Sequence, residues 1–343
     1  MRAMVLETIS HFDRERLPLK LSEVPMPVPA QDELLVKVSA CAVCHTEIDE
    51  IEGRTPPPRM PVIPGHQVIG RVVDAGADAR RYPRGARVGI AWIYSSCGRC
   101  TFCMDGHENL CPDFRATGRD ADGGYAEYMV VRQDFAHPIP DIFTDVEAAP
   151  LLCAGAIGYR SIRLSGVRDG DNLGLTGFGA SAHLVLKMVQ HQLPHTKVFV
   201  FARGEQERSF ARSLGAVWAG DTEDEPPEKL RSIIDTTPAW KPVVEALRNI
   251  EPGGRLVVNA IRKEEKDKNY LQMLDYPVHL WMEKEIKSVA NVTRADVREF
   301  LDLAAAIPIR PQVEEFALAD ANRALCELKE QRIRGAKVLR IGD

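Results

Sequence analysis

Four cysteines within fifteen residues constrain the fold of this chain more than any other feature of its sequence. The segment CGRCTFCMDGHENLC, residues 97–111, has the spacing C-x2-C-x2-C-x7-C. Two-residue spacers let successive thiolates converge on one ion, and tetrahedral Zn²⁺ prefers four such soft ligands. We therefore predict a closed zinc site that stabilises a lobe and takes no part in catalysis, formed by Cys97, Cys100, Cys103 and Cys111. An iron–sulfur cluster is the alternative that the spacing leaves open.

Composition bears on the state of these cysteines. The chain has 343 residues, eight of them cysteine, and a formal net charge of −5 at pH 7. Its N-terminal segment lacks the long apolar core of a signal peptide, and no run of about 18 apolar residues could span a membrane. We expect a cytoplasmic protein whose clustered cysteines bind metal rather than form disulfides. The acidic charge and the lack of a long basic run argue against nucleic-acid binding.

The pattern of strands and helices predicts an α/β protein of two domains. Residues 1–150 contain short β-like runs broken by Pro and Gly, which indicate a β-rich, barrel-like domain. Over residues 151–291, apolar strand runs alternate with helical patterns, as in a doubly wound parallel sheet covered by helices. Residues 292–343 carry an amphipathic helix and a final strand, and the family resemblance described below implies that they belong to the first domain.

A glycine-rich turn in the second domain indicates a dinucleotide site. The run LTGFGASAH places Gly177 and Gly179 between an apolar strand and a helix, with Ala182 where the fingerprint G-x-G-x-x-G has its third glycine. Alanine is an accepted variant there, because the position requires only close helix–strand packing. Such a turn would place a cofactor pyrophosphate on the N-terminus of the helix. A plain strand-to-helix turn is the alternative.

The end of the following strand, KVFVFARG, bears on the choice of cofactor. NAD sites usually carry Asp or Glu at this point to bind the ribose 2′-hydroxyl. Here Ala202 and Arg203 leave room and positive charge for a 2′-phosphate. We therefore predict NADP(H) in preference to NAD(H), with stacking of Arg203 on the adenine of NAD as the alternative. Arg334 and Lys337 are expected on a solvated face rather than at a cofactor phosphate.

Three further residues are weak candidates for metal ligands when each is taken singly. Cys44 lies in CHTE, His66 in PGHQ and Cys153 in APLLCAG. A lone Cys or His in an apolar segment is more often a core residue than a ligand. A catalytic zinc keeps three protein ligands and one open position, and two Cys with one His is a known set. Spacing alone cannot prove this set, because such ligands can lie far apart in the sequence.

CHTE, PGHQ and the cysteine cluster, in this order and at these separations, resemble the zinc-dependent medium-chain alcohol dehydrogenase family. The similarity extends over essentially the whole chain. It implies a GroES-like catalytic domain, a Rossmann cofactor domain and two zinc ions per chain. By the resemblance, Cys44, His66 and Cys153 hold the catalytic zinc, and the cluster holds the structural one. Cys41 and Cys326 are left over, and we expect both to be small buried packing residues.

The resemblance also implies an activity, the interconversion of alcohols, primary ones above all, with aldehydes or ketones. Zinc would polarise the substrate oxygen while hydride passes to or from NAD(P). Thr46 would relay the alcohol proton, and His45 would reach the cofactor phosphates or ribose. Trp92 and Ile48 would shape the substrate pocket, although a core aromatic is the alternative for Trp92. The partners would be small-molecule alcohols and aldehydes and further copies of the chain, as a dimer or a tetramer.

Three positions depart from the family pattern. Glu47 stands where relatives commonly carry Asp, and either carboxylate can hydrogen-bond a ligand imidazole, here that of His66. Gln67 replaces a common Glu, and an amide is a poorer donor to a metal. Asp49 stands where many relatives carry the His that ends the proton relay. Either Asp49 or bulk water would therefore end the relay in this chain.

Two other functions remain open on the sequence alone. A zinc-free quinone or enone reductase could share the fold, but such proteins lack the ligands Cys44, His66 and Cys153. A zinc-stabilised binding module, with the 97–111 cluster as a ribbon, would conflict with the acidic charge and the glycine-rich turn. The number of zinc ions per chain distinguishes all three functions.

Overall fold

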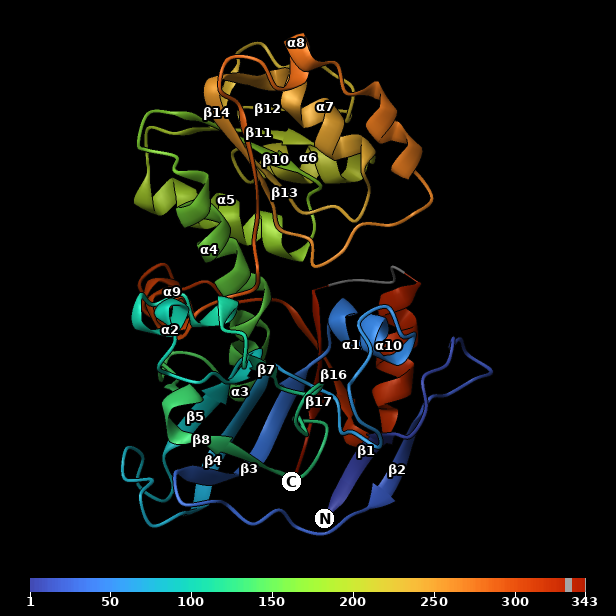
Figure 1. Cartoon of the computed structure of the whole chain (residues 1–343), viewed down its shortest axis with the longest axis vertical. Coiled ribbons are helices and arrows are strands. Elements are labelled where there is room, and N and C mark those ends of the chain that lie inside the picture. The colour runs from blue at the N-terminus through green and yellow to red at the C-terminus, as the bar shows by residue number, and fades with distance from the viewer. Residues whose placement is uncertain (331–334, 343) are drawn as a thin grey trace. The chain divides into compact units, whose positions relative to one another are not determined.

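The computed structural model describes residues 1–330 and 335–342. These residues form two compact units (Figure 1). The first contains Met1–Cys153 together with the described residues from Thr293 onward, and the second is Ala154–Val292. Arg334 lies outside the described residues. The predicted α/β class is confirmed, with a β-rich first unit and a parallel sheet in the second.

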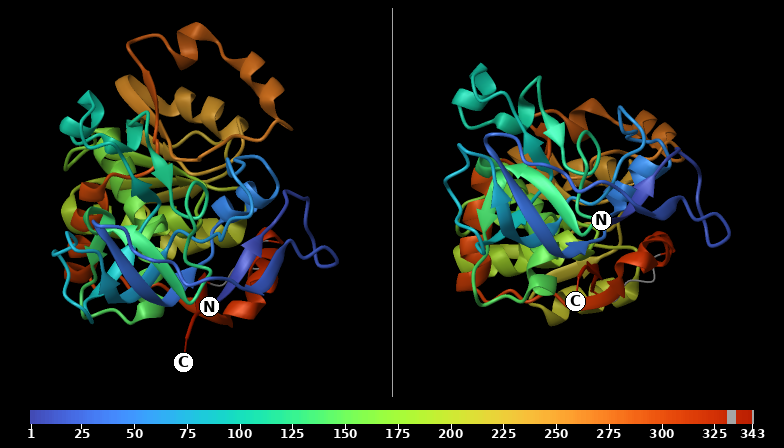
Figure 2. Two further views of the ribbon diagram at one scale, coloured as in Figure 1. Left: turned by 60° about the horizontal axis from the view of Figure 1, so that its bottom comes forward. Right: turned by 90° about the horizontal axis from the view of Figure 1, so that it is seen from below.

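The first unit is built on one large sheet. Its strands run in the order β16-β17-β3-β4-β5-β9, and β8 also pairs with β3. The last strand, β17, pairs with β3 from early in the chain (Figure 2). Two smaller sheets consist of β1-β2 and β6-β7. The strands are β1 Arg2–Leu6, β2 Leu19–Glu23, β3 Glu33–Ala42, β4 Val68–Ala75, β5 Arg87–Ile90, β6 Ile93–Ser95, β7 Arg115–Ala116, β8 Tyr128–Arg132, β9 Ala136–Pro138, β16 Val313–Ala317 and β17 Ala336–Arg340.

Strand β3 is the central element of this unit, and it leads into the candidate site. Its apolar residues Leu34, Val36 and Val38 alternate along the strand and are buried, as expected for a face of an antiparallel sheet that packs on a core. Cys41, near its end, and Cys326 both belong to the hydrophobic core, which confirms that they are packing residues. The helices of the unit are α1 His45–Ile51, α2 Thr101–Met104, η1 Glu108–Leu110, η2 Gln133–Phe135, α3 Asp145–Ala148, η3 Ala149–Leu152, α9 Arg294–Ala306, η5 Leu318–Asp320 and α10 Ala321–Lys329.

Lys337, on β17, does not lie on a solvated face, so that expectation was wrong. Its side chain is buried, and Nζ lies 2.7 Å from Glu314 Oε2 and 2.6 Å from Glu327 Oε2. The two carboxylates come from β16 and α10. They compensate the ammonium charge, which is the condition for burying a lysine.

The second unit is a six-stranded parallel sheet in the order β12-β11-β10-β13-β14-β15. The chain runs outward from β10 to β12 and then resumes on the other side of β10, which is the strand order of the dinucleotide-binding fold. Ligands of such sheets bind outside the carboxyl ends of the strands at this reversal. The strands are β10 Asn172–Thr176, β11 Lys197–Phe201, β12 Trp218–Gly220, β13 Leu230–Asp235, β14 Ile250–Val258 and β15 Glu285–Ser288.

Helices connect these strands, and the inner strands are apolar along their length. Leu173, Leu175, Ile233 and Leu256 are fully buried, as is typical of a parallel sheet covered on both faces. The helices are α4 Ala154–Ser165, α5 Ala180–Gln192, α6 Glu205–Ser213, α7 Lys241–Asn249, η4 Lys268–Met273 and α8 Tyr276–His279. Within the described ranges, every helix is too short or too polar to span a bilayer.

Candidate functional site

Glu47 connects two of the predicted site residues. Cys44 immediately precedes helix α1, and its backbone N–H donates to Glu47 Oε2 at 2.8 Å. The other carboxylate oxygen, Oε1, lies 2.6 Å from His66 Nδ1. Glu47 and His66 are both buried, so bulk water does not compete for this contact. The expected contact of Glu47 with the imidazole is therefore present, and Nε2 is the ring nitrogen left to a metal.

Cys153 completes a group of three donors of the type that zinc uses. It directly follows helix η3. One ligand atom from each of Cys44, His66 and Cys153 lies within 4.8 Å of the others. Ligands about 2.0–2.3 Å from a tetrahedral ion are roughly 3.3–3.8 Å apart, so small side-chain adjustments suffice to bring all three onto one zinc. Two thiolates and an imidazole fit zinc and leave one of its four positions open.

The electrostatics of the group favour the thiolate form of Cys44. The contact with the Cys153 thiol lowers the pKa of Cys44 well below its usual value, burial opposes this shift, and His66 supports it. A thiolate is the form of cysteine that binds a metal. Burial lowers the pKa of His66, but Glu47 and Cys44 together outweigh it and raise that pKa well above its usual value, and the contact with Cys44 raises the pKa of Cys153. A metal bound here would therefore displace protons from both groups.

The remaining predicted residues of α1 have different environments. Thr46 is half-buried, with Oγ1 3.6 Å from Cys44 Sγ, and His45 is exposed. Asp49 is buried, and Arg54 Nε donates to its Oδ1 at 2.6 Å. Ile48 packs within the hydrophobic core of the unit. The structure therefore brings Thr46 to the donor group and gives Asp49 a cationic partner.

Trp92 lies against His66. The two ring centroids are 5.0 Å apart, and the rings meet edge to face at 87°. Trp92 is buried, and the guanidinium carbon of Arg119 lies 5.8 Å from the centroid of its ring. Trp92 is thus both a buried core aromatic and a neighbour of the candidate site. Nothing in the sequence pattern singles out Arg119, because its contact with Trp92 is made across the fold.

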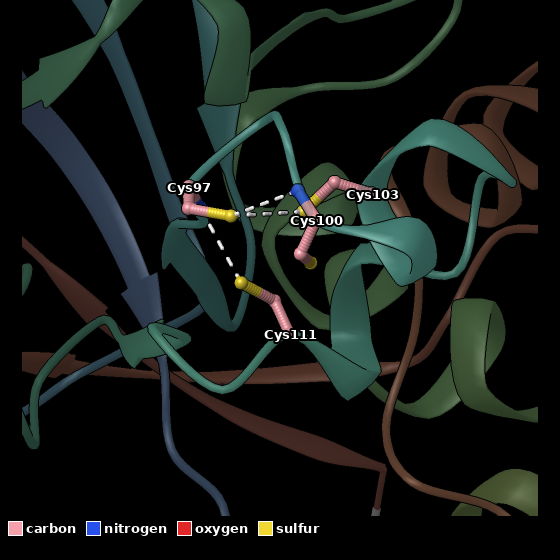
Figure 3. A group of neighbouring side chains, drawn as sticks. All are labelled: Cys97, Cys100, Cys103 and Cys111. Atoms are coloured by element: carbon pink, nitrogen blue, oxygen red, sulfur yellow. Dashed lines mark hydrogen bonds between the residues drawn. The ribbon is translucent and has the colours of Figure 1, made fainter.

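The four cysteines of residues 97–111 face one another (Figure 3). Their sulfur atoms all lie within 4.8 Å of one another, and Cys97 Sγ is 3.9 Å from Cys103 Sγ. Sulfurs about 2.3 Å from a tetrahedral zinc would be about 3.8 Å apart, so the cluster fits this ion. The backbone N–H groups of Arg99 and Cys100 lower the pKa of Cys97 to about 6, which favours its thiolate.

Glu108 ties the cysteine-bearing segment to helix α9. Its side chain is buried, and Oε1 accepts from the backbone N–H of Arg294 at 2.9 Å and from Arg294 Nε at 3.1 Å. Arg294 is the first residue of α9, at the point where the chain re-enters the first unit. A metal in the cluster would therefore stabilise this re-entry as well as its own loop.

The glycine-rich turn links β10 to α5. Gly177 has φ +74°, and an added Cβ would lie only 2.9 Å from Thr237 Cγ2, so this position requires glycine. Gly179 caps the N-terminus of α5, and Ala182 is fully buried in its first turns. This is the strand–turn–helix setting in which the fingerprint binds a pyrophosphate.

The end of β11 presents the two residues that bear on cofactor choice. Ala202 is buried and Arg203 is exposed. Arg208 Nη1 donates to the backbone oxygens of Ala202 at 2.8 Å and Arg203 at 3.2 Å, which fixes the chain there. The carboxylates of Glu205 and Asp221 pair with Arg208, and Arg203 forms no ion pair with any residue that the structure describes. Its charge is thus available to an anionic ligand.

Known proteins resemble this chain along its whole length. Residues 30–141 match the family described as the alcohol dehydrogenase GroES-like domain. A probable alcohol dehydrogenase of Mycobacterium tuberculosis, AdhA, is 44% identical over 329 residues, which cover 94% of this chain and 93% of that protein. An alcohol dehydrogenase of Geobacillus stearothermophilus is 32% identical, covering 95% and 96%. A candidate zinc-binding dehydrogenase of Sinorhizobium meliloti 1021, solved with NADP, has a TM-score of 0.83 at 25% identity, covering 99% and 98%.

Proposed function

This chain belongs to the zinc-dependent medium-chain alcohol dehydrogenase family, and we propose that Cys44, His66 and Cys153 hold its catalytic zinc. The chain is an NAD(P)-linked oxidoreductase that interconverts alcohols with aldehydes or ketones. The grouping of these three donor atoms within 4.8 Å is the observation that supports the zinc site best. The four clustered cysteines would hold a second, structural zinc. Because thiolate ligands must stay reduced, we place the protein in the cytoplasm.

The chain's own residues prepare the site for this chemistry. When bound, zinc would act as a Lewis acid on the substrate oxygen, and the nicotinamide would accept or donate the hydride. Glu47 holds Nδ1 of His66 and so fixes the orientation of the imidazole. The edge contact with Trp92 restrains the same ring from another direction. The two contacts keep Nε2 directed toward the two thiols.

We assign to Thr46 the first transfer of the substrate proton, since its hydroxyl lies beside Cys44 Sγ. Asp49 is a poor end for this relay, because its carboxylate already accepts from Arg54. Solvent, on the side where His45 is exposed, is the alternative that we favour. Asp49→Asn is expected to leave the pH profile of kcat unchanged, whereas a shifted profile would assign the end of the relay to Asp49.

We propose NADP(H) as the preferred cofactor, supported by the exposed Arg203 and the small Ala202 at the end of β11. Glu205 and Asp221 both lie beside Arg208, and their negative charges oppose a phosphate near it. Arg203 would therefore be the residue that recognises the 2′-phosphate. Arg203→Ala is expected to raise KM for NADPH about tenfold or more and to leave KM for NADH within about twofold. A wild-type preference for NADH would contradict this choice.

Zinc analysis combined with activity assays tests the proposed function. We expect about two zinc ions per chain, oxidation of primary alcohols and reduction of aldehydes. His66→Ala should keep about one zinc and lose the activity, because only the closed cysteine site remains intact. A protein without zinc that reduces enones would instead be the zinc-free reductase, and one zinc without any dehydrogenase activity would indicate a binding module.

Trp92 is the residue that we propose to shape the substrate side of the site. It contacts His66 with its edge, so a substrate oxygen bound near His66 would have the indole as a close neighbour. A large fixed ring favours narrow primary alcohols over branched ones. Trp92→Ala is expected to improve kcat/KM for bulky alcohols relative to ethanol. Ile48, within the core, is expected to act on the pocket only through packing.

We propose that the chain assembles with a second copy through β15. Within the described residues this strand pairs only with β14, and all four of its residues are exposed. Four large apolar side chains on this strand or shortly before it in the sequence are about half exposed: Tyr276, Trp281, Met282 and Ile286. An edge strand that pairs with its own copy forms a closed twofold contact. Ile286→Glu should shift the molar mass in light scattering toward the monomer, and an unchanged mass would contradict this contact.

A further inference from the structure

We propose that the buried ion pair of Asp235 and Lys263 positions the glycine-rich turn for cofactor binding. The two residues lie 28 positions apart: Asp235 ends β13, and Lys263 follows the adjacent strand β14. Neither belongs to the glycine fingerprint. This role presupposes that the glycine-rich turn binds NAD(P), as proposed above.

Asp235 is the last residue of β13 and is fully buried. Its register partner on β10 is Thr176, the residue directly before the glycine-rich turn. Oδ1 of Asp235 accepts from Thr176 Oγ1 at 2.6 Å and from Thr237 Oγ1 at 2.7 Å. Oδ2 accepts from Lys263 Nζ. One carboxylate therefore joins the ends of two strands to the segment that follows.

The ammonium group of Lys263 donates three hydrogen bonds. Besides Asp235 Oδ2, Nζ donates to the backbone oxygens of Thr237 at 2.7 Å and Ala239 at 3.1 Å. Its side chain is only 7% exposed. An ammonium has three donors, and all three are used within the protein. Lys263 therefore acts on residues 236–239 and not directly on a ligand.

The segment held in this way touches the glycine-rich turn. Thr236 donates to Thr176 O through its backbone N–H at 3.0 Å and through Oγ1 at 2.9 Å. A Cβ added at Gly177 would lie 2.9 Å from Thr237 Cγ2 and 3.0 Å from Thr236 Oγ1. The first glycine of the fingerprint is thus packed on the residues that Lys263 fixes. These residues lie at the carboxyl ends of β10 and β13, where this fold binds its ligand.

Substitutions of Lys263 separate positioning from mere stabilisation. Lys263→Met leaves the Asp235 carboxylate buried without its cation, whereas D235N/K263M removes both charges and relieves that penalty. Lys266→Met is the matched control, because Lys266 lies on the same loop after β14 as Lys263, with its side chain 72% exposed. The probes are NADPH and NADH, with the dissociation constant measured by fluorescence and the melting temperature by calorimetry.

We expect Lys263→Met to weaken binding of the better cofactor about tenfold to hundredfold, with KM for the alcohol changed less than about twofold. The double variant should regain the melting temperature but not the affinity, because the bonds to Thr237 O and Ala239 O stay lost. Recovery of affinity together with the melting temperature, or normal affinity in a destabilised single variant, would overturn the positioning role. A wild-type protein that binds neither cofactor would instead refute the nucleotide site itself.

Hydrogen exchange on the unmodified protein gives a test that needs no variant. The amides of Thr236 and Thr237 donate to Thr176 O and to Asp235 Oδ1. If the ion pair fixes this segment in advance, both amides exchange slowly before NADPH is added. Rapid exchange that becomes slow only on addition of NADPH would show that the cofactor, and not the ion pair, orders the segment.

Discussion

His66 Nδ1 and Glu47 Oε1 lie 2.6 Å apart in the buried interior of the first unit. The second oxygen of the same carboxylate accepts from the backbone N–H of Cys44. Glu47 therefore fixes the His66 imidazole and the start of helix α1, which follows Cys44, although Glu47 itself is not one of the proposed zinc ligands. The geometry of the proposed zinc site depends on this residue as much as on the ligands themselves.

Replacement of Glu47 tests that dependence. Glu47→Gln keeps the volume of the side chain but removes its charge, and zinc affinity at the Cys44–His66–Cys153 site should fall about 10- to 100-fold. Competition with a chelator at neutral pH measures this loss independently of activity. Glu47→Asp is the control, because it retains the carboxylate and should lose less. Wild-type affinity in the Gln variant would show that the contact has no influence on the metal.

Alanine variants of two glycines with positive φ, Gly170 and Gly177, distinguish the effect of backbone strain from the effect of crowding at the glycine-rich turn. Gly170 has φ +93° with no atom within 4 Å of an added Cβ, whereas Gly177 has φ +74° and close neighbours. Both Gly→Ala changes should cost about 1 kcal/mol or more of unfolding free energy through backbone strain. Only Gly177→Ala should also weaken NADPH binding, about tenfold or more. Equal dissociation constants for the two variants would contradict the assignment of the turn.

The cysteine cluster should be separable from the catalytic centre. Cys103→Ala removes one of four ligands, so we expect the loss of one zinc per chain and a lower free energy of unfolding, because metal binding contributes to folding. Cys326→Ala is the matched control, since Cys326 is a buried packing residue. It should keep both zinc ions and lose only about 1 kcal/mol. Elemental analysis and denaturant unfolding measure the two effects, and equal zinc contents would count against a structural site.

His137 on β9 predicts a pH dependence of stability. Burial lowers its pKa to about 3, and Arg81, Arg294 and Arg298 act in the same direction. The unfolded residue titrates near 6.5, so between about pH 6.5 and 3 only the unfolded state binds this proton. The stability contributed by the neutral imidazole is complete above 6.5 and falls by up to about 1.4 kcal/mol per pH unit as the pH decreases.

His137→Phe removes this titration. The unfolding free energy of the variant, measured from pH 7 to pH 4.5, should decline less steeply than that of the wild type. The difference in slope isolates His137 from the carboxylates that titrate in both proteins. Parallel curves would show that His137 is already accessible to protons in the folded state.

Local patterns predicted the fold, and short motifs marked residues whose donor atoms the structure brings close together; their role as zinc ligands stays a prediction. The alternation of apolar strands and helices predicted the parallel sheet from β10 to β14, and short motifs marked Cys44, His66 and the 97–111 cluster. The structure places each of these groups together. The signals for the parallel sheet and for the 97–111 cluster lie within a few residues of one another in the sequence, whereas Cys44, His66 and Cys153 lie far apart and were grouped by the family resemblance.

Contacts made across the fold escaped prediction. Lys337 looked solvated because its partners, Glu314 and Glu327, belong to other elements. Asp235 and Lys263 have no motif, and only the parallel sheet brings them together. A charged residue at the carboxyl end of an apolar strand, as in RSIID, is the one local signal that could have drawn attention to Asp235.

Anomalous diffraction at the zinc absorption edge tests the central claim most directly. We predict two peaks per chain, one among the sulfurs of Cys97, Cys100, Cys103 and Cys111, and one bounded by Cys44 Sγ, His66 Nε2 and Cys153 Sγ. An active enzyme whose crystals show no zinc peak between Cys44, His66 and Cys153 would contradict the proposed site.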